Sequence, residues 1–457
     1  MTTETAPSQG LPQEPGASAA DNPATAYKRQ TPVRRFFGVL GPGLVAGASD
    51  DDPSGIATYS QAGATFGNGM LWTAPFTLPL MIAVQEICDR TALATGQSLG
   101  ALARVKFGTK AKFVIGVLLV ALVAANCLNL AADLMAIGQG MQLVHAGPAP
   151  VWAALAGVTI TLTLTLGSFE IIARIFKWLC MALLSYVVVL FFVHINWGNV
   201  LQGLIGLHFQ FKPAYLGLIV AVLGTTISPY LFFWQSAHRI EEMRAEELAG
   251  DTAPTLNQRG ARGGRRKLRN SRIDVFTGMI FSVVVMFAII AATAATLGVH
   301  GKAITSAADA AKALEPIAGN LSGVLFAAGF IGSGILAVPV LAASGAAGLS
   351  GLLGKSWGLD RSPRKAPIFY GLLVVGLIAG TILSIFDSDP IGLLVFSATV
   401  NGIAAGPFLI VVMLISRDKQ LMGKYRNGKL AATLGWGTTG LMLIAGVAGI
   451  YFTATGG

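Results

Sequence analysis

Charged residues are scarce in this chain of 457 residues, in which Asp, Glu, Lys and Arg together make up 12%. A soluble domain usually carries about 25% charged residues, so the composition excludes an ordinary soluble protein. Hydrophobic residues make up 53%, and the mean hydropathy is +0.65. The sequence therefore predicts an all-α polytopic membrane protein, whose partners include the lipid bilayer.

Cysteine and the signatures of catalysis are also rare. The three cysteines, Cys88, Cys127 and Cys180, lie in apolar runs at spacings that fit neither a zinc site nor a disulfide framework. We interpret them as small buried hydrophobic residues. The sequence contains no nucleophile–base pair and no phosphate-binding loop, so we expect neither an enzyme nor a bound cofactor.

Apolar stretches of about 20 residues, the length needed to cross a bilayer, occur eleven times. They lie near 36–66, 70–90, 113–143, 150–167, 171–194, 214–238, 273–298, 317–353, 368–386, 390–416 and 430–453. With the N-terminus in the cytoplasm, all of the 32 Lys and Arg residues except Lys212, Lys302 and Lys312 fall on the inner side. This asymmetry predicts a multi-pass protein of the cytoplasmic membrane with its C-terminus outside. The positive charge then reflects topology, and no nucleic-acid partner is expected.

The hydrophilic segments divide the chain. Residues 1–35 are polar and predict a disordered cytoplasmic tail. The membrane-spanning domain covers 36–453, and a loop at 239–272, rich in Gly and Arg, is predicted to be a flexible cytoplasmic linker near anionic lipid. Nothing in the sequence indicates an oligomeric state.

Two of the apolar runs are interrupted by polar residues around a proline. The first interruption is Gly47-Ala48-Ser49-Asp50-Asp51-Asp52-Pro53-Ser54-Gly55, and the second is Gly224-Thr225-Thr226-Ile227-Ser228-Pro229-Tyr230. In hydrocarbon, non-helical backbone is tolerated only where it lines a cavity or is packed in protein. Paired interruptions of this kind are the best sequence pointer to a transporter's substrate site.

The spacing of the two interruptions predicts an inverted repeat. Repeat one covers 36–194 and repeat two 214–416, each with five spans beginning with a broken helix, and 430–453 is an extra helix. An odd number of spans per half inverts the second half, which is the LeuT-like arrangement with the first and sixth helices unwound at the midplane. Proline kinks without a ligand are the structural alternative. A buried carboxylate costs ~2.5–3.5 kcal/mol or more, which favours a functional role for the aspartates.

These residues resemble the natural resistance-associated macrophage protein (NRAMP) family of divalent-metal transporters. The resemblance is carried by Asp52-Pro53-Ser54-Gly55, followed by Gln61-Ala62-Gly63, by Ser228-Pro229-Tyr230, and by Ala132-Asp133-Leu134. It implies that Asp52 is the metal carboxylate. The family's asparagine ligand is Gly55 here, its thioether ligand is Ser228, its histidine is Tyr230, and a glutamate of its proton path is Ala136. The chain is thus similar to the NRAMP-related magnesium transporters, a distant branch.

The positions at which this chain differs from the family's ligands predict a metal site made only of oxygen atoms. Asp52, the unwound backbone at Gly55, and the hydroxyls of Thr226 and Ser228 suit a partly hydrated Mg²⁺ first and Mn²⁺ second, because carboxylate, carbonyl and water oxygens suit these ions. Membrane potential supplies about 4.6 kcal/mol to a divalent cation per 100 mV. Weak or absent proton coupling is therefore expected, and the only bound species is the transported ion.

Further polar residues are candidates for the transport path. Asp51 is expected to be a carboxylate either just behind the metal ligands or at the entrance of the path, whereas Asp50 is expected to end its half-helix in solvent. Glu86 and Asp89 form either an ion pair with Arg90 or a cytoplasmic vestibule. Asp133 is either a helix-locking hydrogen-bond partner or a relay. Tyr230 either gates the site or packs, and Asn401 either bonds a neighbouring helix or approaches the metal.

Asp274 is expected to be an anion at the start of its own span, near Arg272. Two other functions stay open at this point. One is a sodium-coupled symporter for an organic solute with the same fold. The other is a proton-coupled Mn²⁺ or Fe²⁺ transporter.

Overall fold

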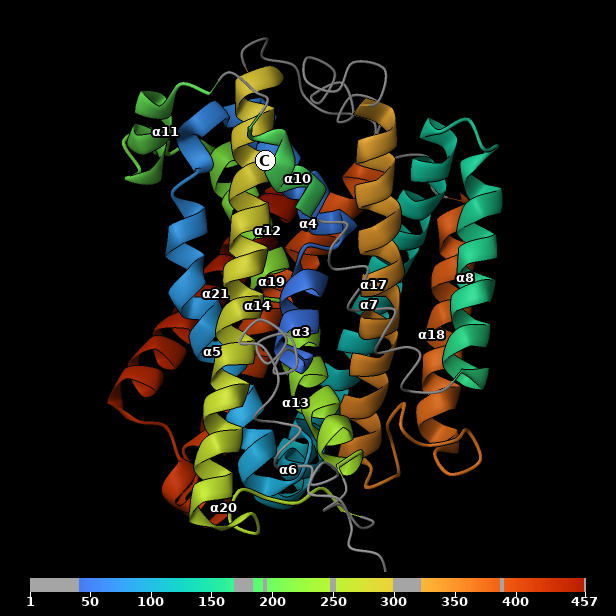
Figure 1. The fold of residues 1–457 in the computed structure, drawn as a ribbon, viewed down its shortest axis with the longest axis vertical. Coiled ribbons are helices and arrows are strands. Elements are labelled where there is room, and N and C mark those ends of the chain that lie inside the picture. Colours follow the sequence, from blue (N-terminus) through green and yellow to red (C-terminus); the bar gives the residue numbers. More distant parts are fainter. Residues whose placement is uncertain are drawn as a thin grey trace, which may run out of the picture. The chain divides into compact units, whose positions relative to one another are not determined.

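Helices account for all the regular secondary structure in the described part of the chain (Figure 1). The computed structural model describes residues 41–167, 184–191, 195–246, 252–298, 322–386 and 390–455, all within one unit, Gly41–Gly457. The elements are α3 (Pro42–Asp50), α4 (Pro53–Phe66), η1 (Gly67–Met70), α5 (Thr73–Thr95), α6 (Leu99–Lys106), α7 (Thr109–Leu143), α8 (Ala149–Leu166), α10 (Leu184–Val189), α11 (Trp197–Leu204), α12 (Pro213–Thr226), α13 (Pro229–Arg244), α14 (Gly260–Thr296), α17 (Ser322–Leu352), α18 (Pro367–Phe386), α19 (Pro390–Ser416), α20 (Lys419–Met422), η4 (Gly423–Tyr425) and α21 (Lys429–Thr455).

Eight helices of the described residues are long and apolar enough to cross a membrane, and a ninth results if the bent pair α4–α5 is taken as one span. The bend between α4 with η1 and α5 is 110°. The predicted span at 171–194 lies mostly outside the described residues, as do the tail at 1–35 and the first residues of the span at 36–66. The first run is otherwise divided into α3 and α4, of 9 and 14 residues.

The predicted linker at 239–272 is wrong at both ends. Helix α13 continues to Arg244, and α14 begins at Gly260, so only a short connection separates the two helices. The backbone N–H of Leu256 in this connection donates to the carbonyl of Leu93 at 3.0 Å. Arg and Lys are good helix formers. A polar segment next to an apolar run can therefore belong to the same helix and need not be a loop.

Helix α14 packs along both parts of the first broken run, contacting α3, α4 and α5. At the crossing with α3, a Cβ atom on Gly278 would lie 2.0 Å from the carbonyl oxygen of Gly43, and one on Gly47 would lie 2.1 Å from the carbonyl of Gly278. Small residues allow such close backbone approach between membrane helices. The crossing brings Ser282, one turn further along α14, to the end of α3.

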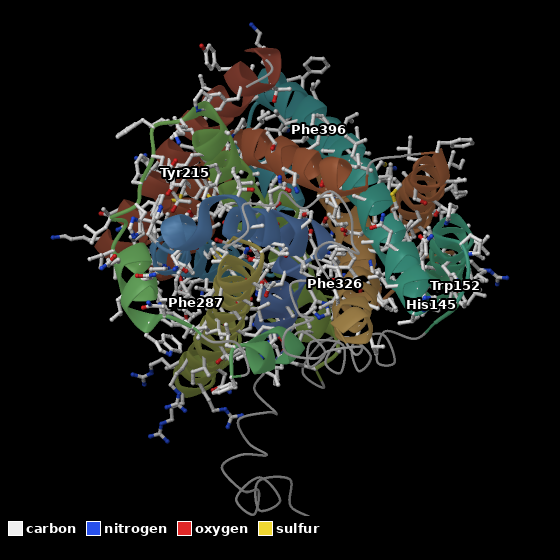
Figure 2. The ribbon with its side chains drawn as sticks, turned by 90° about the horizontal axis from the view of Figure 1, so that it is seen from above. His145, Trp152, Tyr215, Phe287, Phe326 and Phe396 are labelled. Atoms are coloured by element: carbon white, nitrogen blue, oxygen red, sulfur yellow. The ribbon has the colours of Figure 1, made fainter. Side chains whose placement is uncertain are left out.

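A second group of helices forms around α7, which contacts α17, α18, α8 and α19. Viewed from above, Trp152 and His145 lie near the α7–α8 connection, on the opposite side of the molecule from Tyr215 and Phe287 (Figure 2). The Tyr215 hydroxyl donates to the carbonyl of Gly69 at 2.6 Å and accepts from Trp72 Nε1 at 2.9 Å. These bonds fix the start of α12 against the turn between α4 and α5.

Candidate metal site

The first interruption is a two-residue break between α3 and α4. Helix α3 ends at Asp50 and α4 begins at Pro53, whose ring removes a backbone donor and disfavours helical backbone in the preceding residue. Asp52 has extended backbone, and its Oδ1 accepts hydrogen bonds from Gly55 N at 2.7 Å and Ser54 Oγ at 2.6 Å. The buried Asp52 carboxylate is therefore the N-cap of α4.

The second interruption lies between the end of α12 at Thr226 and the start of α13 at Pro229. The Ser228 hydroxyl donates to the carbonyls of Gly224 at 2.6 Å and Thr225 at 2.8 Å. The Thr226 hydroxyl also donates to carbonyls of its own helix. Both hydroxyls thus satisfy carbonyls near the end of α12, and their own oxygens keep lone pairs that can accept.

The two breaks lie against each other. The Tyr230 hydroxyl, in the first turn of α13, is 3.0 Å from the carbonyl oxygen of Ser49 and 3.2 Å from Asp52 Oδ2. A Cβ atom on Gly55 would lie 3.2 Å from Thr225 Oγ1. The structure therefore places Asp52, Gly55 and Tyr230 together with the end of α12, and a larger side chain at position 55 would enter a tight gap.

Asp50 and Asp51 are fully buried. Ser282 Oγ of α14 donates to Asp50 Oδ2 at 2.6 Å and is 3.4 Å from Asp51 Oδ1. The expectation that Asp50 ends the half-helix in solvent is wrong, because the close crossing of α14 covers it. Within the described residues, Asp50 Oδ1 and Asp51 Oδ2 have no hydrogen-bond partner. The first break thus carries three buried carboxylates.

Two further predicted residues lie on neighbouring helices. Asp133 of α7 is fully buried, and neither of its carboxylate oxygens has a hydrogen-bond partner among the residues described. Asn401 of α19 accepts from Asn129 Nδ2 at 3.1 Å, which is the interhelical bond expected of a membrane amide. Asn401 Nδ2 is left without a partner in the described part of the chain. Because both Asp133 oxygens lack a partner, Asp133 forms no helix-locking hydrogen bond within the described residues.

Metal-binding potential at the breaks comes from oxygen atoms. In the described ranges no group of three or more His, Cys, Asp and Glu side chains is arranged to hold a metal ion. The breaks offer instead the Asp52 carboxylate that caps α4, with Asp50 and Asp51 buried beside it, together with hydroxyls and backbone carbonyls. Such a set matches hard cations that retain water.

A sequence profile of the family described as natural resistance-associated macrophage protein-like (Nramp) matches residues 43–452. The chain belongs to the Nramp family. The resemblance predicted from the two interruptions is thereby confirmed. Nramp membership and the apolar helices make this chain a multi-pass membrane protein.

Curated relatives of this Nramp chain are named as transporters rather than enzymes. The divalent metal cation transporter MntH of Mycobacterium tuberculosis is 26% identical over 440 residues, which cover 94% of this chain and 95% of the relative. MntH of Deinococcus radiodurans is 24% identical over 416 residues, covering 88% and 87%.

Solved structures share the fold of this Nramp chain. A mutant of the Eremococcus coleocola manganese transporter superposes with a TM-score of 0.71 at 15% identity, covering 92% of this chain and 87% of that one. Mhp1, a nucleobase-cation-symport-1 family transporter, gives a TM-score of 0.54 at 16% identity, covering 90% and 91%. The architecture is therefore the helical transporter fold common to both.

The end of α5 carries an ion pair rather than free acids. Glu86 accepts from Arg90 Nε at 3.0 Å and from Arg272 Nε at 2.9 Å. The ion pair expected with Arg90 is therefore present for Glu86. Asp89, by contrast, does not pair with Arg90: it is fully buried and accepts from Arg239 Nε at 2.6 Å. The prediction for Asp89 was wrong because its partner comes from α13.

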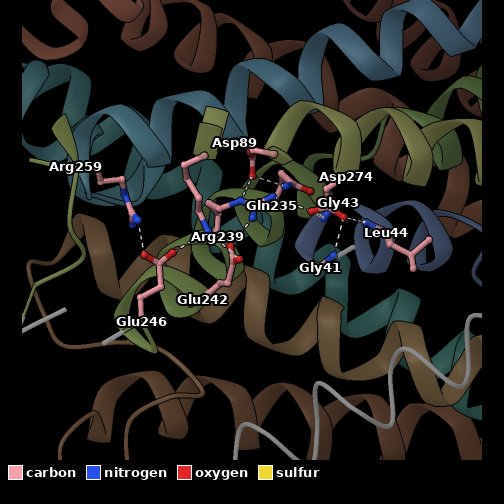
Figure 3. A network of polar contacts seen from close by, with 12 residues as sticks. Gly41, Gly43, Leu44, Asp89, Gln235, Arg239, Glu242, Glu246, Arg259 and Asp274 are labelled. Atoms are coloured by element: carbon pink, nitrogen blue, oxygen red, sulfur yellow. Dashed lines mark hydrogen bonds and ion pairs between the residues drawn. The ribbon is translucent and has the colours of Figure 1, made fainter. Parts of the chain in front are cut away.

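Asp89 belongs to a buried polar network that joins four helices (Figure 3). Gln235 Nε2 donates to Asp89 at 2.6 Å, and Ser271 Oγ also donates to it. Arg239 Nη2 donates to Asp274 Oδ2 at 2.8 Å, and Arg239 also pairs with Glu242. The guanidinium therefore links α5, α13 and α14 through charge-assisted bonds.

Asp274 connects this network to α3. Its carboxylate accepts from the backbone N–H groups of Gly41 at 2.7 Å, Gly43 at 2.8 Å and Leu44 at 3.0 Å. Asp274 was expected to sit at the start of its own helix, but α14 begins at Gly260. The carboxylate instead caps the N-terminus of α3, where free N–H groups and the helix dipole favour an anion.

Ser282 and Arg239 were missed as members of these polar contacts. Ser282 lies in an apolar run that gives no signal of its partner. Arg239 stands five residues before the end of α13 at Arg244, whereas the apolar pattern predicts an end at 238 and places Arg239 in the linker. Its only sequence signal was a cation beside an apolar run, which predicts snorkelling as readily as pairing.

Proposed function

We propose that this Nramp protein is a secondary transporter that takes up a divalent metal cation, Mg²⁺ and/or Mn²⁺, by alternating access. The observation that carries the proposal is the meeting of the two helix breaks at Asp52. The Tyr230 hydroxyl from one break is 3.2 Å from the Asp52 carboxylate of the other. The names of the curated relatives, divalent metal cation transporters, support the same class of cargo.

The proposed binding site consists of oxygen atoms and retained water. Asp52 supplies the charge, Thr226 and Ser228 supply hydroxyl lone pairs, and Gly55 contributes only backbone beside Asp52, because the gap at this position is too tight for a larger side chain. Asp51 lies next to this site, with one oxygen free of hydrogen bonds in the described part of the chain. Mg²⁺ dehydrates reluctantly and usually keeps several waters on one or two carboxylates, so this set favours Mg²⁺, with Mn²⁺ second.

The proposed architecture is the LeuT-like one, with eleven spans in a five-plus-five inverted repeat and the first and sixth spans unwound at the bilayer midplane. The N-terminus is proposed to lie in the cytoplasm and the C-terminus outside the cell inner membrane, following the distribution of Lys and Arg. In this orientation the network of Asp89, Arg239 and Asp274 closes the cytoplasmic end. Opening to the cytoplasm then requires α3 to leave the Asp274 carboxylate.

Proton coupling is proposed to be weak or absent. Membrane potential alone, at about 4.6 kcal/mol per 100 mV for a divalent cation, supports more than a thousandfold accumulation. The glutamate that the family places in the proton path is Ala136 in this chain. No proton is therefore needed to drive uptake.

A proton-coupled Mn²⁺ or Fe²⁺ transporter is the second candidate, and Asp133 is the observation that favours it. A fully buried carboxylate without a hydrogen-bond partner in the described residues is suited to bind and release a proton. A sodium-coupled symporter for an organic solute has less support. A substrate carboxylate would need the N–H groups at the start of α4, and Asp52 already occupies that of Gly55.

Replacing Ser228 with methionine tests the metal preference. A thioether at this break adds a soft ligand, so we expect Ser228→Met to raise the rate of Cd²⁺ transport relative to Mg²⁺ by roughly tenfold, which is about 1.4 kcal/mol of differential binding. Dye-loaded vesicles containing the purified protein report both ions. Ser228→Leu is the matched control, because it adds similar bulk to the buried position without sulfur. An unchanged Cd²⁺ to Mg²⁺ ratio in Ser228→Met would count against Ser228 at the site.

A further inference from the structure

A cavity of about 700 Å³ lies away from the helix breaks, between α5, α14 and the segment from η4 to the start of α21. Helix α5 contacts both α14 and α21, so it forms the middle of the cavity. The first turns of α21 lie out to the side of α5 and α14 (Figure 1). Neither the proposed metal site nor the Asp89 network uses this space.

The lining of the cavity is strongly cationic. Its charged residues are Arg90, Arg272, Lys424, Arg426 and Lys429, with Glu86 as the single acid. Both oxygens of Glu86 are already engaged, by Arg90 and Arg272. In the described part of the chain, Arg426 and Lys429 are exposed and form no ion pair. The cavity therefore presents cations that lack a protein counter-charge.

The same cavity has an apolar side. Leu430 is 74% exposed and Phe276 is 45% exposed, and both line the cavity. Ile82 and Leu434 continue the apolar surface inward from α5 and α21. An exposed cationic rim beside exposed apolar side chains, on helices long enough to cross a membrane, matches an amphiphile with an anionic head and a hydrocarbon tail.

We propose that this cavity binds an anionic phospholipid. Its phosphate lies at Arg272, Arg426 and Lys429, and an acyl chain lies along Phe276 and Leu430. A free phosphate ion would use the cations but gain nothing from the apolar side. A zwitterionic lipid would use the apolar side but carry no net charge for the cations. The bound lipid links α21 to α14, the helix that carries Asp274 and Ser282.

Lipid binding to the full chain, measured by native mass spectrometry and by thermal stabilisation in detergent, tests this proposal. We expect added phosphatidylglycerol to bind and stabilise the protein, and phosphatidylcholine to do so much less. Each basic residue near an anionic lipid contributes about fivefold in affinity, so Arg426→Gln/Lys429→Gln is expected to weaken phosphatidylglycerol binding roughly 25-fold. Leu430→Ser, at an exposed position, is expected to weaken it without changing the charge.

The matched control removes the same charge elsewhere. Arg364→Gln/Lys365→Gln changes two exposed basic residues in the connection from α17 to α18, and it is expected to leave phosphatidylglycerol binding unchanged. Equal binding of phosphatidylcholine would overturn the proposal. So would stabilisation by inorganic phosphate or glycerol phosphate equal to that by the lipid, or an equal loss in the control variant.

Discussion

Replacing Asp52 with alanine or asparagine is expected to reduce Mg²⁺ flux to the level of vesicles without protein. Asp52 is the only carboxylate that contacts both helix breaks in the described residues, through Gly55 N and the Tyr230 hydroxyl. Without Asp52, a divalent cation between the two breaks would lose its nearest counter-charge in a region where burying charge is costly. Both variants remove that charge, so both should abolish transport.

The two Asp52 variants are expected to differ in stability. This difference distinguishes loss of the metal site from damage to the fold. Asp52 is the N-cap of α4, and asparagine caps a helix as well as aspartate does, whereas alanine does not. Asp52→Ala is therefore expected to lose ~1 kcal/mol of unfolding free energy, and Asp52→Asn much less. Thermal unfolding of the purified variants beside their flux gives both values. Normal flux through a well-folded Asp52→Asn protein would remove Asp52 from the site.

Replacing Arg239 with methionine is expected to cause the largest loss of stability. The guanidinium is buried and pairs with Asp89 and Asp274, both fully buried. Removing one partner of a buried ionic group leaves uncompensated charge, which typically costs 3–5 kcal/mol. Because Asp274 also accepts from the first N–H groups of α3, the loss of its Arg239 partner should speed amide hydrogen exchange at residues 43–50. Denaturant unfolding and exchange of the purified protein measure the two effects.

Two comparison variants make the Arg239 result specific. Lys106→Met breaks a partly exposed pair with Asp418 and is expected to cost ~1 kcal/mol or less. Arg239→Met/Asp89→Asn removes one of the stranded charges, so it should be more stable than Arg239→Met alone. A loss in Arg239→Met no greater than in Lys106→Met would show that the network contributes little.

Local chemistry explains which parts of the site were predictable. Pro53 and Pro229 lack a backbone donor and disfavour helix in the preceding residue, so each predicts a break from a few residues alone. The structure adds that Asp52 is the N-cap of α4, a role that was not predicted although an Asp before a proline is a favourable cap. The apolar runs from 368–386 and 390–416 correspond to α18 and α19, because a long uncharged run has few alternatives in a membrane protein.

Contacts between distant segments were not predictable from one sequence. The Tyr230–Asp52 contact joins residues 178 positions apart, and the Asp274 cap on Gly43 joins residues 231 apart. Asp50 was misplaced in solvent because nothing in its own segment shows that Gly278 lets α14 approach so closely. The linker was misassigned because polar composition marks the end of an apolar run, but not the end of a helix.

Potential-driven transport through an oxygen-only site can be measured as Mg²⁺ entry into vesicles that contain the purified protein and both a Mg²⁺ dye and a pH dye. We expect uptake that rises as the interior is made more negative, with no acidification in fixed proportion to the metal. Entry that ignores voltage, or that brings protons with each ion, would contradict potential-driven transport. Absence of any Mg²⁺ or Mn²⁺ entry through the folded protein would contradict the oxygen-only cation site itself.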